Sequence, residues 1–289
     1  MTMKVAAVQM RSGVDPAGNA DDMARLVRDA AARGAIYVQT PEMTGMLQRD
    51  RKAAREVLRG EADDLIVETA RGLAAELGIF LHIGSTAIAR DDGKIANRSF
   101  LFSPQGDLIS TYDKIHMFDV DLDNGESWRE SSAYEPGTVS KVVELPFAKL
   151  GMSICYDLRF PQLFRAQAMA GAKILTVPAS FTRQTGEAHW EILLRARAIE
   201  NGAFLVAAAQ AGVHEDGRET YGNSLIIDPW GRILARGGDA GEEVLVAEID
   251  LDSVERTRKK VPNLKNAREF VLEDVAGPDA ARGAGGVAV

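Results

Sequence analysis

The sequence contains very little cysteine and no long apolar run. Cys155 is the single cysteine in 289 residues, which excludes an internal disulfide framework and a zinc or iron–sulfur site built from several cysteines. A membrane-spanning helix needs roughly 18 or more consecutive apolar residues, and no such run occurs. The N-terminus passes directly into a strand-like pattern, VAAVQM, without the apolar region of a signal peptide. We therefore expect a cytoplasmic protein.

Basic charge is also scarce. The 34 Lys and Arg residues are outnumbered by 42 Asp and Glu residues, which gives a net charge of −8. Because no basic stripe could neutralise phosphates, neither a nucleic acid nor an anionic membrane is expected as a partner. The glycine-rich phosphate-binding motifs and the His-Glu-x-x-His pair are absent, and the four histidines are scattered. We therefore predict no cofactor and no metal.

The order of apolar patterns predicts an α/β fold. Apolar residues make up 46% of the chain and charged residues 26%, as in ordinary globular proteins. Short β-rich runs alternate with longer segments of helical period. We expect strands at 3–10, 35–42, 79–84, 96–103, 107–112, 139–145, 149–154, 173–178, 203–209, 222–228 and 244–249. We expect helices at 16–33, with Asn19 or Asp21 as N-cap, at 61–77, from Pro161 onward, and at 187–201.

The domain organisation is expected to be simple. No Pro-, Gly- or Ser-rich linker interrupts residues 3–270, so residues 3–272 are predicted to form one domain. The segment 275–289 is rich in small residues and offers nothing to bury. We expect this tail to be disordered, or to be ordered only by contact with a partner subunit.

Cys155 is predicted at the end of a strand, within the order strand, tight turn, helix, strand over 149–178. Open α/β sheets place their sites at the carboxyl ends of strands, and a nearby helix N-terminus lowers the pKa of a thiol. The segment GMSIC approaches the Gly-x-Ser-x-Gly motif, but Ser153 would lie inside the strand, which argues against a serine hydrolase. A lone cysteine is, by itself, more often a small buried apolar residue.

Two charged residues also come just past apolar strands. Glu42 follows YVQTP, and Lys114 follows LISTY. Each alone is more often a solvated loop charge, because charged groups are rarely buried unless they are paired. Together with Cys155, an acid and an ammonium at strand ends are the components of a hydrolytic thiol site.

The chain resembles the nitrilase, or carbon–nitrogen hydrolase, superfamily over residues 3–265. The matching segments are VAAVQM (5–10), TPEMTG (40–45), NRSFLFSPQGDLISTYDKIHMFDVD (97–121), WRES (128–131), GMSICYDLRFPQLFRAQAMAGAKILTVPASF (151–181), HWEILLRARAIENGAFLVAAAQAG (189–212) and YGNSLIIDPWGRIL (221–234). The resemblance implies an α-β-β-α sandwich and a Glu-Lys-Cys triad with a second, assisting glutamate. These roles fall on Glu42, Lys114, Cys155 and Glu130.

The resemblance also implies a reaction, the hydrolysis of a carboxamide to a carboxylate and ammonia through a thioester. Lys114 would favour the thiolate, and Glu42 would carry protons between sulfur, leaving group and water. The oxyanion donors would be Lys114 and the backbone N–H of Tyr156. Arg159 and Arg183 are candidates for binding a substrate carboxylate, and structural salt bridges are an equal alternative for both.

Several alternatives remain open at this point. Among the branches of the superfamily, the likeness is to the amidases of deaminated glutathione. An ω-amidase or an N-carbamoyl amino acid amidohydrolase would use the same residues, and a catalytically silent scaffold would have kept only the fold. Asn223 stands where relatives often have histidine, which leaves a substrate contact there in doubt. A papain-like pairing of Cys155 with His116 or His189 is not favoured.

We also expect a homodimer or a higher homo-oligomer. The apolar helical faces after Pro161 and His189 are compatible with an interface between subunits. In the second of these helices, Leu193, Ala196 and Ile199 are predicted to lie in the core or at such an interface.

Overall fold

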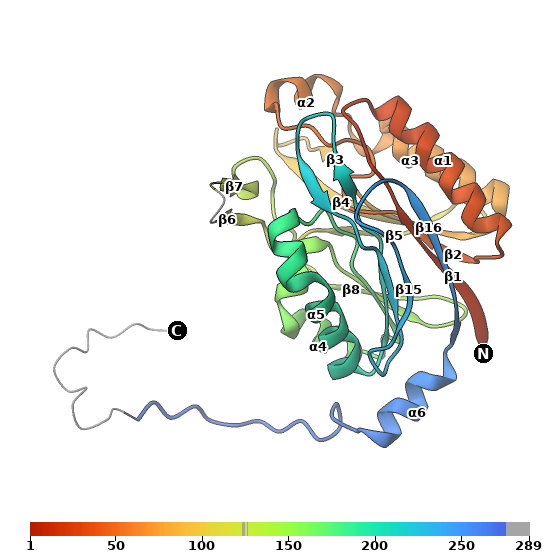
Figure 1. The fold of residues 1–289 in the computed structure, drawn as a ribbon, viewed down its shortest axis with the longest axis vertical. Helices are drawn as coiled ribbons and strands as arrows, with labels where there is room; N and C mark the ends of the chain where they lie inside the picture. The colour runs from red at the N-terminus through yellow and green to blue at the C-terminus, as the bar shows by residue number, and fades with distance from the viewer. Residues whose placement is uncertain (123–124, 126, 276–289) are drawn as a thin grey trace.

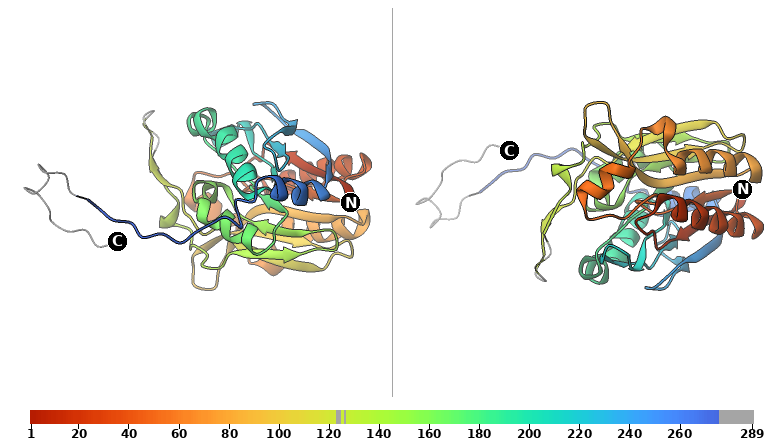
Figure 2. Two further views of the ribbon diagram at one scale, coloured as in Figure 1. Left: turned by 90° about the horizontal axis from the view of Figure 1, so that it is seen from below. Right: turned by 90° about the horizontal axis from the view of Figure 1, so that it is seen from above.

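A computed structural model describes residues 1–122, 125 and 127–275 (Figure 1). Two six-stranded sheets face one another, and a pair of helices covers the outer side of each sheet (Figures 1 and 2). The expected α-β-β-α sandwich is therefore confirmed. Val275 is exposed, and the rest of the expected tail, 276–289, lies outside the described residues.

The two sheets have the same plan. The first sheet has the order β16 (Glu243–Asp250), β1 (Thr2–Gln9), β2 (Tyr37–Gln39), β3 (Phe80–Ala89), β4 (Ile95–Phe102) and β5 (Leu108–Asp113). The second has the order β15 (Ile233–Arg236), β14 (Leu225–Ile227), β11 (Phe204–Ala207), β10 (Ile174–Thr176), β9 (Lys149–Met152) and β8 (Lys141–Glu144). In each, three central strands run parallel and the flanking strands pair antiparallel.

Four helices form the outer layers. These four are α1 (Pro16–Ala32), α3 (Leu65–Leu77), α4 (Pro161–Met169) and α5 (Arg183–Asn201). Two further helices are α2 (Arg51–Val57) and α6 (Asp252–Lys260). Helices α1 and α3 pack on the first sheet, and α4 and α5 pack on the second. Among the described residues, no helix is both long enough and apolar enough to cross a bilayer.

The apolar residues of β1 alternate between two cores. Met3, Val5 and Ala7 point between the sheets, whereas Ala6 and Val8 point toward α1 and α3. Because successive side chains of a strand face opposite sides, a strand covered on both faces is apolar throughout. This double burial explains why the strand is a continuous apolar run rather than an apolar and polar alternation.

The start of α1 differs from the prediction. Asp15 is the N-cap, and its carboxylate accepts hydrogen bonds from the N–H groups of Ala17 and Gly18. Asn19 lies one turn further along and is buried, where its amide binds neighbouring loop backbone. The expectation of Asn19 or Asp21 as N-cap is therefore wrong, because an acceptor directly before the first turn takes the free N–H groups.

The buried face of α5 is also offset from the predicted one. The face that packs on the second sheet consists of Trp190, Leu194, Arg197 and Ala198. Leu193 and Ala196 are half-buried, and Ile199 is 52% exposed. The core assignment of Ile199 is therefore wrong, and a subunit contact on that face stays a prediction.

Short elements lie between Lys114 and Gly137, a range in which the sequence predicts no helix or strand. Strands β6 (Asp119–Asp121) and β7 (Ser127–Arg129) pair as a ribbon, and the 3₁₀ turn η2 (Glu130–Ser132) follows. A second ribbon joins β12 (Ala211–Val213) to β13 (Glu219–Tyr221), and two more 3₁₀ turns are η1 (Glu61–Asp63) and η3 (Cys155–Arg159). Strands of three residues are too short to show a period in the sequence.

Candidate active site

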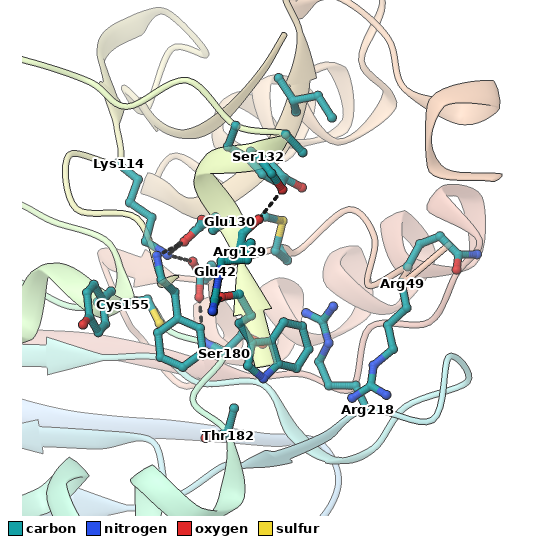
Figure 3. Close-up of a pocket in the computed structure, with 18 of the residues that line it drawn as sticks. Glu42, Arg49, Lys114, Arg129, Glu130, Ser132, Cys155, Ser180, Thr182 and Arg218 are labelled. Carbon is teal, nitrogen blue, oxygen red and sulfur yellow. Dashed lines mark hydrogen bonds and ion pairs between the residues drawn. The ribbon is translucent and has the colours of Figure 1, made fainter. Parts of the chain in front are cut away.

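Glu42, Lys114 and Cys155 meet at one edge of the sandwich (Figure 3). They come from three loops, which follow β2, β5 and β9 respectively. Lys114 Nζ donates to Glu42 Oε1 at 2.9 Å, and the Cys155 thiol is close enough to the same carboxylate to lower its pKa. All three residues are buried, with 4%, 2% and 6% exposure. The residues predicted separately at three strand ends therefore lie around one cavity.

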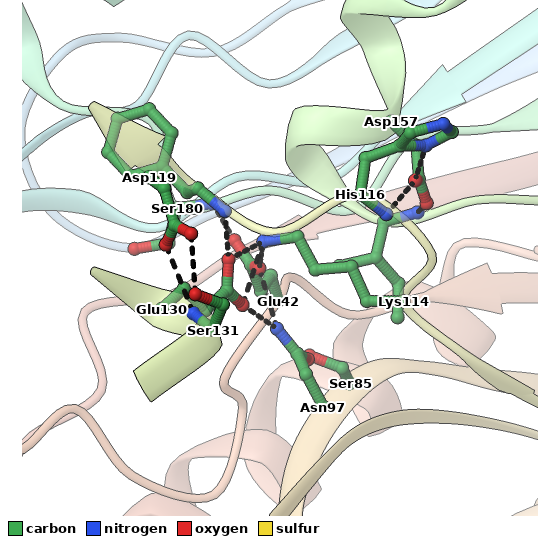
Figure 4. Close-up of polar contacts among 12 residues, drawn as sticks. Glu42, Ser85, Asn97, Lys114, His116, Asp119, Glu130, Ser131, Asp157 and Ser180 are labelled. Carbon is green, nitrogen blue, oxygen red and sulfur yellow. Dashed lines mark hydrogen bonds and ion pairs between the residues drawn. The ribbon is translucent and has the colours of Figure 1, made fainter. Parts of the chain in front are cut away.

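Glu130 and Asn97 complete a buried network around the ammonium (Figure 4). Glu130 accepts from Lys114 Nζ through both oxygens, at 3.0 and 2.8 Å, and from the N–H of Phe118 at 2.7 Å. Asn97 Nδ2 donates to Glu42 Oε1 at 2.9 Å and to Glu130 Oε1 at 3.1 Å. The carbonyl of Asn97 also accepts the N–H of Lys114 at 3.0 Å. Asn97 thus holds both carboxylates and the lysine main chain.

The backbone at Cys155 lies in the left-handed region, with φ of 49°. This conformation is unfavourable for a residue with a side chain and persists only where the surroundings enforce it. Here the N–H of Cys155 donates to the carbonyl of Pro178 at 2.8 Å, which ties the turn to the loop after β10. Tyr156 follows within the 3₁₀ turn η3 and lines the cavity described below.

Asp157 joins the cysteine turn to the segment around Lys114. Its carboxylate accepts from the N–H of Ile154 at 2.8 Å and from the hydroxyl of Tyr112 at 2.7 Å. The other oxygen accepts from the N–H of His116 at 3.1 Å and lies 2.6 Å from its Nδ1. Because Tyr112 and His116 bracket Lys114, one fully buried side chain fixes the separation of the ammonium and the sulfur.

The loop that carries Glu42 is held by close backbone contacts. A Cβ added at Gly84 would lie 2.2 Å from the carbonyl oxygen of Thr40 and 2.4 Å from Pro178. Only glycine fits there, because any side chain would push apart the loops that hold the glutamate and the cysteine turn. Gln210 Nε2 donates to the carbonyl of Glu42 at 3.1 Å.

The network keeps Glu42 and Lys114 ionised. Burial raises the pKa of Glu42, but the Lys114 charge and hydrogen bonds from Cys155, Lys114 and Asn97 outweigh burial, and the net pKa lies below the ordinary value. Burial lowers the pKa of Lys114, but the charges of Glu130 and Glu42 raise it well above its ordinary value. The pair is therefore an ammonium and a carboxylate at neutral pH.

The resting sulfur, by contrast, is a neutral thiol. Burial and the Glu42 charge raise the pKa of Cys155 well above its ordinary value, although Lys114 and the N–H of Ser180 act in the opposite direction. Lys114 does lower the pKa of Cys155, as expected, but burial and the Glu42 charge raise it by more. Two carboxylates around one ammonium leave the site with a net negative charge, which disfavours a second anion.

These residues line a cavity of about 450 Å³ (Figure 3). Its walls include Glu42, Lys114, Glu130, Cys155 and Tyr156, and five arginines also reach it: Arg49, Arg51, Arg55, Arg129 and Arg218. This volume suits a small organic molecule. None of the five arginines was predicted. Arg49 and Arg218 lie in loops, Arg51 and Arg55 in the short helix α2, and Arg129 in the three-residue strand β7, and only the folding of the chain brings them to the cavity.

Contrary to expectation, neither Arg159 nor Arg183 is among the lining residues. The guanidinium carbon of Arg159 lies 5.6 Å from the ring centres of Tyr156 and Phe181, and its nitrogens lie 3.3 and 3.4 Å from His189 Nδ1. Arg183 is half-exposed and pairs with three surface carboxylates, those of Glu187, Glu219 and Asp239. The geometry matches the salt-bridge alternative for Arg183, because its guanidinium is already engaged.

The remaining polar candidates have structural roles. Asn223 has a φ of 54°, a conformation that Asn tolerates, and its amide donates to the carbonyl of Tyr221. Asn223 does not line the cavity, and His116 and His189 bind Asp157 and Arg159 rather than sulfur. In the described part of the chain, no group of three or more His, Cys, Asp or Glu side chains is placed to hold a metal.

Comparisons with known proteins agree with this architecture. Residues 4–259 match the carbon–nitrogen hydrolase family. The chain is 40% identical over 267 residues to a deaminated glutathione amidase from Yersinia enterocolitica, covering 91% of this chain and 92% of the relative. It is 34% identical over 271 residues to an omega-amidase from Danio rerio, covering 92% and 94%.

Solved structures show the same fold. The Caenorhabditis elegans NitFhit protein superimposes with a TM-score of 0.85 at 32% identity, over 92% of this chain and 65% of that one. An amidase from Nesterenkonia sp. AN1, captured with acrylamide added to its active-site cysteine in a Glu-to-Gln mutant, gives 0.73 at 26%, over 90% and 98%. The fold is that of the nitrilase superfamily. The chain belongs to the carbon–nitrogen hydrolase family, whose members hydrolyse carbon–nitrogen bonds other than peptide bonds, and the expected amidase class is confirmed.

We predict that Asn97→Ala moves the acid limb of kcat/KM to higher pH. Hydrogen bonding from Asn97 lowers the pKa of Glu42, so its loss raises the pH below which Glu42 is protonated and inactive as a base. Losing hydrogen bonds to charged groups also destabilises the fold by about 1.5–3 kcal/mol. The measurements are a pH–rate profile and thermal unfolding, with exposed Asn266→Ala as the control. An unmoved acid limb would contradict the role given to Asn97.

Proposed function

We propose that Glu42, Lys114 and Cys155, assisted by Glu130, hydrolyse a small carboxamide through a thioester on Cys155. The observation that supports this proposal is that one buried carboxylate, Glu42, is hydrogen-bonded to the ammonium and lies close enough to the thiol for each of the two to shift the pKa of the other. A base must come within hydrogen-bond reach of the proton that it removes, and Glu42 is the carboxylate placed to do so.

In the first step, sulfur attacks the amide carbon while its proton passes to Glu42. The thiol is neutral at rest, so proton transfer accompanies attack rather than preceding it. The negative charge that develops on the amide oxygen is stabilised by Lys114 and by the backbone N–H of Tyr156. Lys114 contacts both oxygens of Glu130, so one of its N–H groups can turn to the substrate while Glu130 keeps the other.

In the later steps, protonated Glu42 gives its proton to the departing nitrogen, and the carbon–nitrogen bond breaks. The thioester remains on Cys155. Glu42 then accepts a proton from water as that water attacks the thioester, and the proton returns to sulfur as the acid leaves. Each cycle consumes one amide and one water and needs no cofactor.

Deaminated glutathione, or a similar small amide, is the substrate that the relatives favour. Its amides are secondary, so the leaving group would be an amine, whereas a primary amide would release the expected ammonia. ω-Amidase activity is the second candidate, favoured by the similarity to the zebrafish omega-amidase. Hydrolysis of N-carbamoyl amino acids is a third use of the same residues. A silent scaffold is disfavoured, because a protein that only kept the fold has no need of two buried carboxylates and one ammonium beside a thiol.

We propose in addition that the protein works in the cytoplasm as a homodimer or higher homo-oligomer. On α5, Ile192 and Ile199 are 69% and 52% exposed, an apolar surface that a second subunit would cover.

Intact-protein mass spectrometry after brief exposure to a panel of amides is the direct test. We expect the wild type to gain the mass of an acyl group on its only cysteine. Cys155→Ala should show neither the adduct nor turnover while unfolding at an unchanged temperature. Turnover by this variant, or an acyl group on another residue, would refute the proposed mechanism.

The neutral thiol predicts an unusual alkylation profile. Because the pKa of Cys155 lies well above 9.0, the rate of reaction with iodoacetamide should rise steadily between pH 7 and pH 9 without a plateau. Glu42→Gln removes the neighbouring anion and lowers this pKa, so alkylation at pH 8 should accelerate while amide turnover falls at least about a hundredfold. The urea-unfolded protein supplies the reference rate. A wild-type plateau below pH 8 would instead indicate a preformed thiolate.

Replacing Lys114 should separate stability from chemistry. Lys114→Met leaves two buried carboxylates without their cation, which destabilises a protein by about 3–5 kcal/mol, and removes an oxyanion donor, which reduces kcat roughly a hundredfold or more. Adding Glu130→Gln should restore part of the unfolding temperature but none of the activity. Recovered activity in the double variant would rule out an oxyanion role for Lys114.

A further inference from the structure

The cavity has ends of opposite charge. Around Cys155, the carboxylates of Glu42 and Glu130 outnumber the single ammonium of Lys114. Figure 3 shows Arg49 and Arg218 together on the other side of the pocket, away from Cys155. An anionic group is therefore repelled from the reacting end and attracted to the opposite end.

Arg218 has unsatisfied hydrogen-bonding capacity. Its side chain is only 18% exposed, yet its Nε has no hydrogen-bond partner. Asp216 forms an ion pair with Nη2 at 3.8 Å, which is too long for a hydrogen bond, and its buried Oδ2 also has no hydrogen-bond partner. A buried guanidinium normally binds a carboxylate through two parallel hydrogen bonds, and this one lacks them.

Arg49 places a second positive charge beside the first. The guanidinium carbons of Arg49 and Arg218 lie 5.2 and 4.7 Å from the ring centre of Trp128, so both cations share one aromatic platform. Burial lowers the pKa of Arg218, the charge of Asp216 opposes this effect, and the charge of Arg49 adds a smaller lowering. In the described residues, no carboxylate is hydrogen-bonded to either guanidinium. Two cations held together in this way are stabilised by an anion between them.

Two of the other three arginines at the cavity are engaged elsewhere. Arg129 forms two hydrogen bonds to the carboxylate of Asp121, at 2.9 and 2.8 Å, and Arg51 donates to the hydroxyl of Ser132 at 2.5 Å. The third, Arg55, is an exposed residue of α2. The shared contact with Trp128, together with the burial of Arg218, singles out Arg218 and Arg49.

We propose that Arg218 and Arg49 bind a carboxylate of the substrate that lies remote from the scissile amide. The pair thereby selects amides that carry a carboxylate and orients them with the amide at Cys155. This inference rests on the proposed amidase function and names its substrate class. Arg218 and Arg49 act in binding and orientation, not in the bond-breaking steps.

Matched substrates test the proposal. Glutaramate carries its carboxylate on the acyl side, N-butyrylglycine carries it on the amine side, and pentanamide and N-butyrylglycine methyl ester are their uncharged counterparts. Arg218→Gln should lower kcat/KM about tenfold to a hundredfold for at least one anionic substrate, mainly through KM, and less than about threefold for the uncharged ones. Whichever anionic substrate loses the rate identifies the side that carries the carboxylate.

Two controls separate binding from folding. Arg28→Gln changes a surface arginine that pairs with Glu76, and it should leave all four rates unchanged. Free guanidinium ion should restore part of the anionic rate to Arg218→Ala, which a merely structural defect would not allow. Equal losses on charged and uncharged substrates, or no loss in the double variant Arg49→Gln/Arg218→Gln, would overturn the proposal.

A binding measurement keeps this inference distinct from the proposed reaction. Calorimetric titration of glutarate into the wild type should show binding that weakens at least about tenfold in Arg218→Gln and is unchanged in Arg28→Gln. If no amide were hydrolysed but this difference appeared, the reaction would be refuted and the carboxylate site would stand. Equal glutarate binding by the wild type and Arg218→Gln would refute the carboxylate site whatever the turnover.

Discussion

The ammonium of Lys114, buried between two carboxylates, is the interaction on which the rest of the site depends. Glu42 and Glu130 come from separate segments, one after β2 and the other in η2. Burying their two carboxylates without this cation would cost a large free energy. Asn97 binds both acids from the side and prevents them from separating. The polar network therefore holds its members in position through charge and not through apolar packing.

The same arrangement determines the state of the sulfur. Lys114 lowers the pKa of Cys155, but it is already paired with two carboxylates. Burial and the charge of Glu42 therefore keep Cys155 protonated. An enzyme with a resting thiolate exposes a strong nucleophile at all times. In the mechanism that we propose, the nucleophile forms only when a substrate oxygen is present to receive the charge, which would restrict the chemistry to molecules that fill the cavity.

The sequence was sufficient to predict the layers of the fold and the three strand-end residues, because apolar runs and the convergence of parallel strands are local and topological rules. It could not reveal Asn97, since a polar residue inside a strand carries no sign of what it faces. The preference of a guanidinium for carboxylates suggested Arg159 and Arg183, but only the folded chain shows that three carboxylates pair with Arg183 and that Nε of Arg218 has no hydrogen-bond partner. Loop residues are the least predictable, because their neighbours are set by the whole fold.

The carboxylate of Asp157 has a mechanical consequence. It accepts hydrogen bonds from the turn that carries Cys155 and from residues on both sides of Lys114. The separation of the Cys155 sulfur and the Lys114 ammonium therefore depends on a residue that does not line the cavity, whereas entry to the cavity depends on the residues that do.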